Sequence, residues 1–188
     1  LLRRGRSTVH ARCDMVQGGA VGASAIAIFG AARPSQFVRE MPAPDPGRHP
    51  GDPSLPAFDY SFAPAFSRHF EARWAYGTAP FTGFHEPRSM IYARLRDREC
   101  GPEDALLALA DVIPTPVLSM LTRRVPASSL SWMIEVLRDP GALDLRDWAL
   151  IDTEVRAGTD GYLSQTSVLY GRDGHAYSVS HQTVGVFG

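Results

Sequence analysis

Two polar residues lie in segments with an apolar face, and their side chains suit the activation of a water molecule. Asp111 closes the run ALLALAD and lies three and four residues beyond Ala108 and Leu107, so it falls on the apolar stripe of a helix. Burial there raises the pKa of a carboxylate toward that of a useful base. Gln182 lies in the closing stretch SVSHQTVGVFG, and its amide can both donate and accept a hydrogen bond without carrying charge.

Each of these residues also has a plainer interpretation. Asp111 could cap the segment that follows Pro114 or pair with an arginine, and a lone glutamine in a strand usually faces solvent. The sequence lacks the GxSxG pattern of a covalent serine nucleophile, and its six histidines and two cysteines show no zinc-ligand spacing. The sequence therefore shows neither a covalent serine motif nor a zinc motif, and we expect no cofactor and no metal.

Composition and charge exclude several classes of protein. The 188 residues carry a net charge of −1, so the chain lacks the basic excess that binding to nucleic acid needs. No apolar run reaches the length of about 20 residues that a membrane-spanning helix requires. Cys13 and Cys100 are too few for a disulfide scaffold, which fits a reducing compartment. We therefore expect a cytoplasmic protein with neither nucleic acid nor membrane as a partner.

The first part of the chain is typical of a β-hairpin followed by an irregular crossing. Residues 6–16 alternate between apolar and polar side chains, and a glycine-rich turn separates them from a second apolar run at 20–29. The stretch MPAPDPGRHPGDPSLP (41–56) holds six prolines, which exclude a helix or a central strand. It is predicted to be a stiff linker or a surface crossing between two structural units.

The remainder predicts a sheet and one long apolar helix. The expected helix covers 101–121, with Pro102 in its first turn and with Pro114 and Pro116 ending or kinking it. Arg94, Arg96 and Arg98 are expected to form a solvated strand end, and binding of phosphate groups is the alternative. Strands are predicted at 70–76, 89–97, 129–138, 148–158, 161–171 and 176–187. This order indicates an α+β fold in which a curved antiparallel sheet wraps around a central helix.

The two ends of the chain resemble each other. Gly5–Gly30 and Gly161–Gly188 both turn at a glycine-containing loop and end in Phe-Gly, and this alignment sets Ser24 against Gln182. The interpretation is a duplication, in which residues 1–30 are the last two strands of a first copy whose helix precedes Leu1. The alternative is a chance similarity between two amphipathic hairpins.

These motifs resemble those of the double-hotdog acyl-CoA thioesterases, the type II acyl-CoA thioesterase group and its bacterial thioesterase-like relatives. The resemblance is carried by GPEDALLALADVIPTP, SSLSWMIEVLR and DWALIDTEVRAGTDGYLSQTSVLYGRDGHAYSVSHQTVGVF, with GRSTVHARCDMVQGGAVGASAIAIFG in the first part. It implies a double hotdog whose first hotdog is incomplete in this chain. Residues 1–40 would be the C-terminal strands of the first hotdog, 41–57 a proline-rich linker and 58–188 the second hotdog.

The resemblance also implies a function and a site. The family hydrolyses acyl-CoA thioesters in lipid metabolism, with a water held by an Asp, a Ser or Thr, and a Gln. The matching positions are Asp111, Ser129 and Gln182, although Ser128 and Ser131 lie close to Ser129. The implied substrate is acyl-CoA, the implied products are the free acid and CoA, and the implied assembly is a homodimer.

One departure from the family pattern favours a different function. Type II members carry an Asp-His pair just after the Ser or Thr, where this chain has Ser131 and Trp132. The alternative is therefore an acyl-binding or acyl-CoA-binding hotdog protein without catalysis, since a fold does not fix a function. A hotdog hydratase would need a histidine near the helix start, and residues 86–174 hold none.

Overall fold

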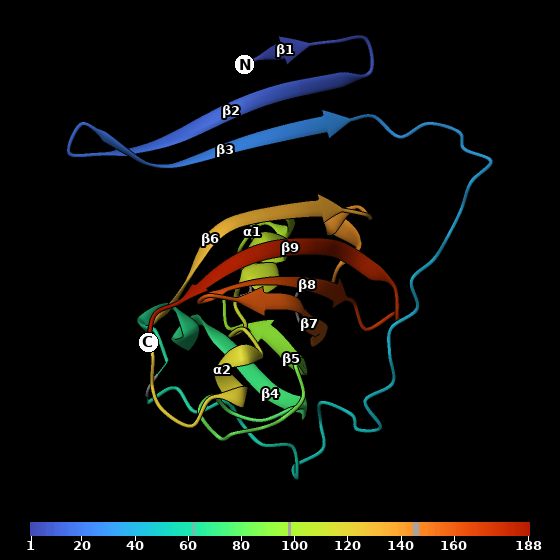
Figure 1. Cartoon of the computed structure of the whole chain (residues 1–188). Coiled ribbons are helices and arrows are strands. Elements are labelled where there is room, and N and C mark those ends of the chain that lie inside the picture. Colours follow the sequence, from blue (N-terminus) through green and yellow to red (C-terminus); the bar gives the residue numbers. More distant parts are fainter. Residues whose placement is uncertain (62, 98, 145–146) are drawn as a thin grey trace. The chain divides into compact units, whose positions relative to one another are not determined.

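The chain divides into two compact units, Leu1–Arg39 and Glu40–Gly188, each of which is described here by itself. The computed structural model (Figure 1) describes residues 1–61, 63–97, 99–144 and 147–188. Within these ranges, no helix has the length and apolar character needed to cross a bilayer.

The first unit is a three-stranded antiparallel sheet in the order β1-β2-β3. Its strands are β1 (Arg3–Arg4), β2 (Thr8–Gln17) and β3 (Ala20–Gly30), so the hairpin predicted from the alternating pattern is present. The two-residue turn uses Gly18 and Gly19, whose φ angles of +58° and +82° suit a tight hairpin connection. Ser24, the residue that the duplication sets against Gln182, donates to Asp14 Oδ1 at 2.6 Å on the neighbouring strand.

The second unit is a six-stranded antiparallel sheet in the order β4-β5-β7-β8-β9-β6. Its strands are β4 (Phe70–Tyr76), β5 (Arg88–Leu95), β6 (Ala127–Val136), β7 (Ala149–Thr159), β8 (Tyr162–Tyr170) and β9 (Ala176–Val186). The helical elements are η1 (Ala65–His69), α1 (Pro102–Asp111), α2 (Val117–Met120) and η2 (Pro140–Ala142). All six strands expected from the sequence of this unit form.

Helix α1 is shorter than the range predicted from the sequence. It begins at Pro102, whose missing N–H costs nothing in a first turn, and it ends at Asp111 rather than continuing to residue 121. Pro114 explains the end, because its ring would clash with the carbonyl of Ala110 and it biases Ile113 away from helical backbone. Asp111 is therefore held at the carboxyl terminus of the helix.

Both faces of this sheet are covered over its central strands. Adjacent residues of a strand point to opposite faces, and Ile91, Ile151 and Leu169 pack with α1 while their preceding neighbours form a second apolar cluster. That second cluster is composed of Met90, Leu150, Val168, Tyr170 and Ala176. These pairs of neighbours are apolar because each side chain finds a buried environment on one face or the other. Strand β6, by contrast, is exposed along nearly its whole length.

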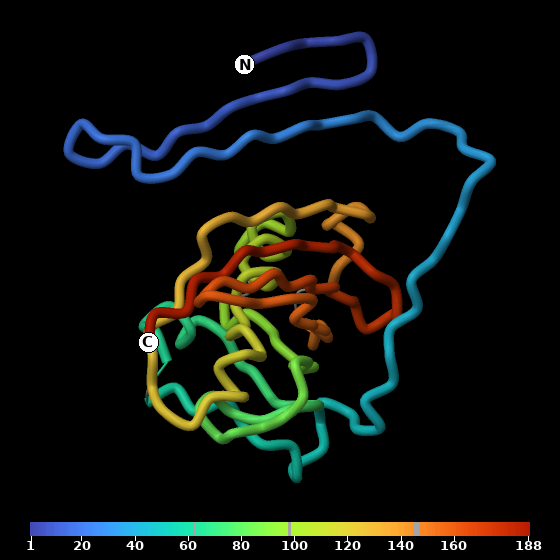
Figure 2. Tube along the Cα trace, viewed as in Figure 1, coloured from blue at the N-terminus to red at the C-terminus, as the bar shows by residue number. Residues whose placement is uncertain are grey.

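The proline-rich segment belongs to the second unit and lies on the face of the sheet opposite α1, and it can be followed in Figure 2. Ala43 packs against the second apolar cluster, and its N–H donates to Gly174 O at 3.1 Å. Tyr92 Oη donates to Arg48 O at 2.8 Å, and Leu55 is only 4% exposed. The segment is thus a surface crossing that covers the sheet.

A pair of neighbouring leucines on α1 tests this packing. Leu106 is 1% exposed within the cluster between α1 and the sheet, whereas Leu107 is 41% exposed. We expect Leu106→Ala to lower the free energy of unfolding by about 2–5 kcal/mol. The control Leu107→Ala should change it by about 0.5 kcal/mol or less. Equilibrium denaturation of both variants would measure the difference, and equal losses would contradict the assigned burial.

Candidate functional site

Asp111 lies where the electrostatics of the helix disfavour its charge. The carboxyl end of a helix carries partial negative charge, and the last turn of α1 holds no basic residue to offset it. Although Asp111 presents surface to solvent, the surrounding protein desolvates its carboxylate, and this burial raises its pKa. A hydrogen bond from Gln182 lowers the pKa in part, so the net shift is upward. The carboxylate therefore holds a proton more tightly than an exposed aspartate does.

Gln182 is the hydrogen-bond partner of this carboxylate. It lies on β9, and its Nε2 donates to Asp111 Oδ1 at 2.7 Å. Its other amide atom, Oε1, accepts a hydrogen bond of 2.7 Å from Nε2 of Gln165 on β8. The two residues are direct cross-strand partners in the β8–β9 register. A row of two amides and one carboxylate therefore runs from β8 across β9 to the end of α1.

A β-bulge sets which serine of the 128–131 cluster shares a face with Gln182. On β6, Trp132 pairs with Gln182 and Ser129 pairs with Val184, two residues further along the same face of β9. The register shifts between Ser129 and Ser131, which makes Leu130 the extra residue. Ser131 pairs with Thr183 and so belongs to the opposite face. Within the described part of the chain, the Ser129 side chain makes no hydrogen bond, and Ser128 Oγ donates to the Ser129 carbonyl at 3.4 Å.

Two cavities meet at Asp111. The first has a volume of about 390 Å³, and its polar lining includes Asp111, Gln182, Gln165, Thr115 and the two serines 128 and 129. Its apolar wall is formed by Phe58, Phe66, Val112, Ile113, Leu118 and Val184. The second cavity, of about 450 Å³, is lined by apolar residues that include Phe66, Phe70, Leu107 and Trp132. Asp111, Phe66 and Val112 line both, so the carboxylate is at the boundary between them.

The structure thus brings together Asp111 and Gln182, which lie 71 positions apart in the sequence. Asp111 and Gln182 are in direct contact, and Ser129 lines the same cavity without bonding to either of them. Gln165 was missed by the sequence analysis, which treated its segment only as a strand. The signal that could have indicated Gln165 is strand alternation. It places this polar residue on the same face of β8 as Leu163 and Ser167, whose side chains are buried.

His181 lies beside Gln182 but faces the other way. Its Nδ1 lies 3.2 Å from Thr166 Oγ1 on the opposite face of the β8–β9 pair. Across the described ranges, no three His, Cys, Asp or Glu side chains gather as metal ligands would.

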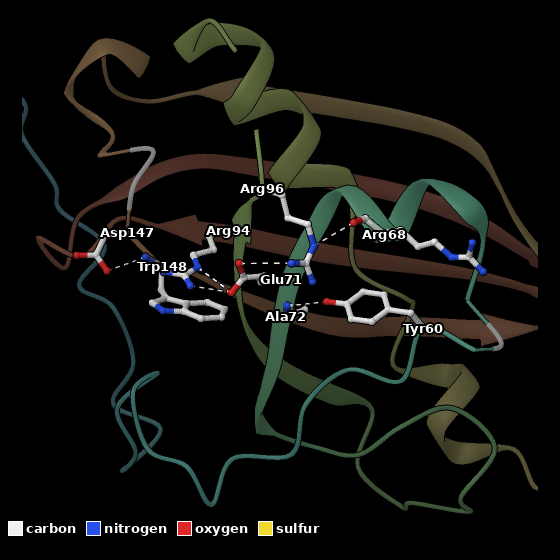
Figure 3. Close-up of polar contacts among 8 residues, drawn as sticks. All are labelled: Tyr60, Arg68, Glu71, Ala72, Arg94, Arg96, Asp147 and Trp148. Carbon is white, nitrogen blue, oxygen red and sulfur yellow. Dashed lines mark hydrogen bonds and ion pairs between the residues drawn. The ribbon is translucent and has the colours of Figure 1, made fainter. Parts of the chain in front are cut away.

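The arginines near the end of β5 form an ion-pair cluster with an acidic partner on β4 (Figure 3). Arg94 donates twice to Glu71 Oε2, at 3.1 and 2.7 Å, and its guanidinium lies 4.5 Å from the centre of the Trp148 ring. Arg96 Nε donates to the Arg68 carbonyl at 3.1 Å. These contacts connect β4 and the end of β5 with Trp148, which precedes β7, and with Arg68 on η1, whereas Arg98 lies outside the described residues.

Comparison with known proteins gives one family match. Residues 38–186 match the family model described as the acyl-CoA thioesterase C-terminal domain. A search of curated proteins found no match.

Several solved structures share the fold over the whole chain. A conserved hot dog fold protein from Alicyclobacillus acidocaldarius is 26% identical, with a TM-score of 0.81 over 100% of this chain and 70% of that one. The tesB protein of Mycobacterium avium subs paratuberculosis is 18% identical, with a TM-score of 0.73 over 100% and 69%. Acyl-CoA thioesterase II TesB2 of Mycobacterium marinum is 20% identical, with a TM-score of 0.72 over 100% and 72%. The α+β hotdog fold expected from the sequence is confirmed.

The raised pKa of Asp111 makes a prediction about stability. The folded state holds the Asp111 proton more tightly than the unfolded chain, so this group's contribution to stability is full below the unfolded pKa and is lost as pH rises through the folded pKa. Asp111→Asn keeps an acceptor for Gln182 but removes the charge. We expect it to raise the free energy of unfolding at neutral pH relative to the wild type, measured by urea denaturation.

The matched control is Asp104→Asn in the first turn of the same helix, where a negative charge is favoured. This change should lower the free energy of unfolding, so the two variants should shift stability in opposite directions. A loss of stability in Asp111→Asn equal to that of the control would contradict the assigned desolvation.

Proposed function

This chain belongs to the acyl-CoA thioesterase C-terminal domain family, and from that premise we propose that it hydrolyses acyl-CoA thioesters to a free acid and CoA. In this proposal, a water molecule is held and activated by Asp111, Ser129 and Gln182. The observation that carries it is the 2.7 Å hydrogen bond between Gln182 and a carboxylate of raised pKa, at the boundary of two apolar-walled cavities.

Asp111 serves as the base in the first step. It takes a proton from the water as the water oxygen attacks the thioester carbonyl carbon, which gives a tetrahedral intermediate with an oxyanion. The carbon–sulfur bond then breaks, the carbonyl re-forms, and the CoA sulfur leaves with the proton that Asp111 had taken. The carboxylate is thereby regenerated, and no covalent enzyme intermediate is needed, in keeping with the absence of a GxSxG motif.

Gln182 positions both the base and the water. One N–H of its amide donates to Asp111 Oδ1, and the second N–H of the same nitrogen remains for the water or for the developing oxyanion. Its Oε1 accepts a hydrogen bond from Gln165, so in this proposal the residue acts toward the reaction through its donor. This donation also favours the ionised form of Asp111 that the base must adopt.

Ser129 and the cavity walls supply the remaining contacts. The Ser129 hydroxyl lines the first cavity from β6 and, as donor and acceptor, can hold the same water. The apolar lining of the two cavities suits an acyl chain, and Trp132 contributes to the second of them. A homodimeric assembly and a cytoplasmic location stay predictions.

A non-catalytic acyl-CoA-binding protein is the second candidate. It is favoured by the residues that stand in place of the family's Asp-His pair, since Ser131 belongs to the face of β6 opposite Gln182. Trp132 lies on the face of Gln182, but it offers no carboxylate or imidazole to the reaction.

Hydrolysis of a panel of acyl-CoA thioesters, from short to long chains, distinguishes the two candidates. The purified chain would be mixed with each thioester, and a disulfide dye would measure the free CoA thiol that hydrolysis releases. We expect Asp111→Asn to lower kcat/KM by about 10²–10⁴-fold, because general-base catalysis contributes a factor of that size. Gln182→Leu should also lower kcat, since it removes the donor that holds the base.

His181→Ala is the matched control, because it changes the neighbouring residue on the opposite face of β9. It should keep a rate close to that of the wild type. Binding of acyl-CoA that stays intact over hours, with no rate on any chain length, would support the binding protein instead.

A further inference from the structure

We propose that Gln165 is a positioning residue for this reaction, which acts by holding the Gln182 amide in the orientation that presents an N–H to Asp111. The proposal rests on the proposed function. It assigns to β8 a part in a site whose other members lie on β6, β9 and α1.

The geometry places Gln165 one contact away from the base. Its Nε2 donates to Gln182 Oε1 at 2.7 Å, and Gln182 Nε2 donates onward to Asp111 Oδ1 at the same distance. The two glutamines are direct partners on neighbouring strands, so the β8–β9 ladder fixes the separation of their backbones. Gln165 is 2% exposed, and little solvent reaches it to compete for Gln182.

A primary amide needs such an anchor because its two ends have almost the same shape. Turned by half a rotation, Gln182 would present Oε1 to Asp111, and two acceptors would face each other unless the carboxyl group carried a proton. That orientation would also bring the Gln182 NH₂ group against the Gln165 NH₂ group, donor against donor. With Gln165 in the orientation found, its donor therefore penalises the orientation of Gln182 in which Asp111 could not act as a base.

The unpaired atom of Gln165 argues against a role in packing alone. Among the described residues, its buried Oε1 has no hydrogen-bond partner. A buried polar atom without a partner is unfavourable, and an apolar side chain of similar volume would satisfy the fold at this position without that penalty. The hydrogen bond that its Nε2 group donates to Gln182 explains why this position holds a glutamine.

Other titratable groups lie on the wall of the second cavity, in the first turn of α1 and on β9. His69, Asp97 and Cys100 line the second cavity, and Glu103 and Asp104 occupy the first turn of α1. His181 belongs to the opposite face of β9. Substitution of Gln165 leaves all of these in place, so a difference between the wild type and a Gln165 variant reports on the amide row.

The first test is Gln165→Met, which keeps the volume and removes the donor. Without the hydrogen bond from Gln165, the Gln182 amide populates both orientations. The orientation that presents Oε1 to protonated Asp111 then becomes more populated. We expect the pKa of Asp111 to rise, measured by NMR titration of its labelled carboxyl carbon. In the hydrolysis assay, kcat should fall by about tenfold to a hundredfold, KM should change little, and the acid limb of the kcat/KM profile should move to higher pH.

The second test is Gln165→Glu, which keeps the shape but makes the end of the side chain an acceptor when ionised. Gln182 then lies between two carboxyl groups and can donate toward only one of them. The two groups should titrate as a coupled pair, so the Asp111 carboxyl signal should change in two steps instead of one.

Ser167→Ala is the matched control. Ser167 is the next residue along the same buried face of β8, and its hydroxyl lies 2.8 Å from Thr153 Oγ1, away from the amide row. This variant should lose some stability and should leave the Asp111 titration and the pH profile of the wild type unchanged.

The titration separates failure of this inference from failure of the proposed function, because it needs no turnover. Identical Asp111 titration curves in the wild type, Gln165→Met and Gln165→Glu would overturn the positioning role even if the chain is a thioesterase. If the Asp111 titration curves of the variants are shifted but the chain hydrolyses no acyl-CoA, the hydrogen-bonded row of Gln165, Gln182 and Asp111 is retained and the proposed reaction is overturned.

Discussion

The hydrogen bond from Gln182 Nε2 to Asp111 Oδ1 joins the last strand of the chain to the end of its only long described helix. It satisfies a carboxylate that the helix terminus and the surrounding protein both disfavour. The same bond lowers the pKa of that carboxylate in part and so favours its ionised form. In the reaction that we propose, a carboxylate of raised pKa is suited to act as the base near neutral pH. The rest of the second unit keeps these two groups within reach of each other.

The central strands of the sheet achieve this by being covered on both faces. Helix α1 packs against one face through Leu106 and Leu109, and the proline-rich segment packs against the other through Ala43. A helix held on a well-packed sheet cannot easily turn or slide, since close packing resists small displacements. The position of Asp111 relative to β9 is therefore a consequence of core packing and of the prolines that end the helix.

Two β-bulges decide which polar residues reach the site. On β6, the extra residue Leu130 allows Ser129 and Trp132, three positions apart, to lie on the same face. On β9, the register shift near Tyr170 makes Tyr177 an extra residue, and this pairs Gln165 with Gln182 rather than with His181. Strict alternation in either strand would have moved these side chains to the wrong face. Bulges near functional sites re-aim side chains in this way.

The amino-acid sequence by itself determined the elements, their order and the α+β class, because alternation, apolar helical spacing and proline are local signals that act over a few residues. It also indicated Asp111 and Gln182, since each is a polar residue within an apolar pattern. The tertiary structure decided that these two residues touch, that α1 ends at Asp111, and that Gln165 stands behind Gln182. Contacts between strands depend on register, and one extra residue in a strand changes the register of every residue beyond it. No local signal in the sequence reports such a bulge, which is why the partner of Gln182 became visible only in the folded sheet.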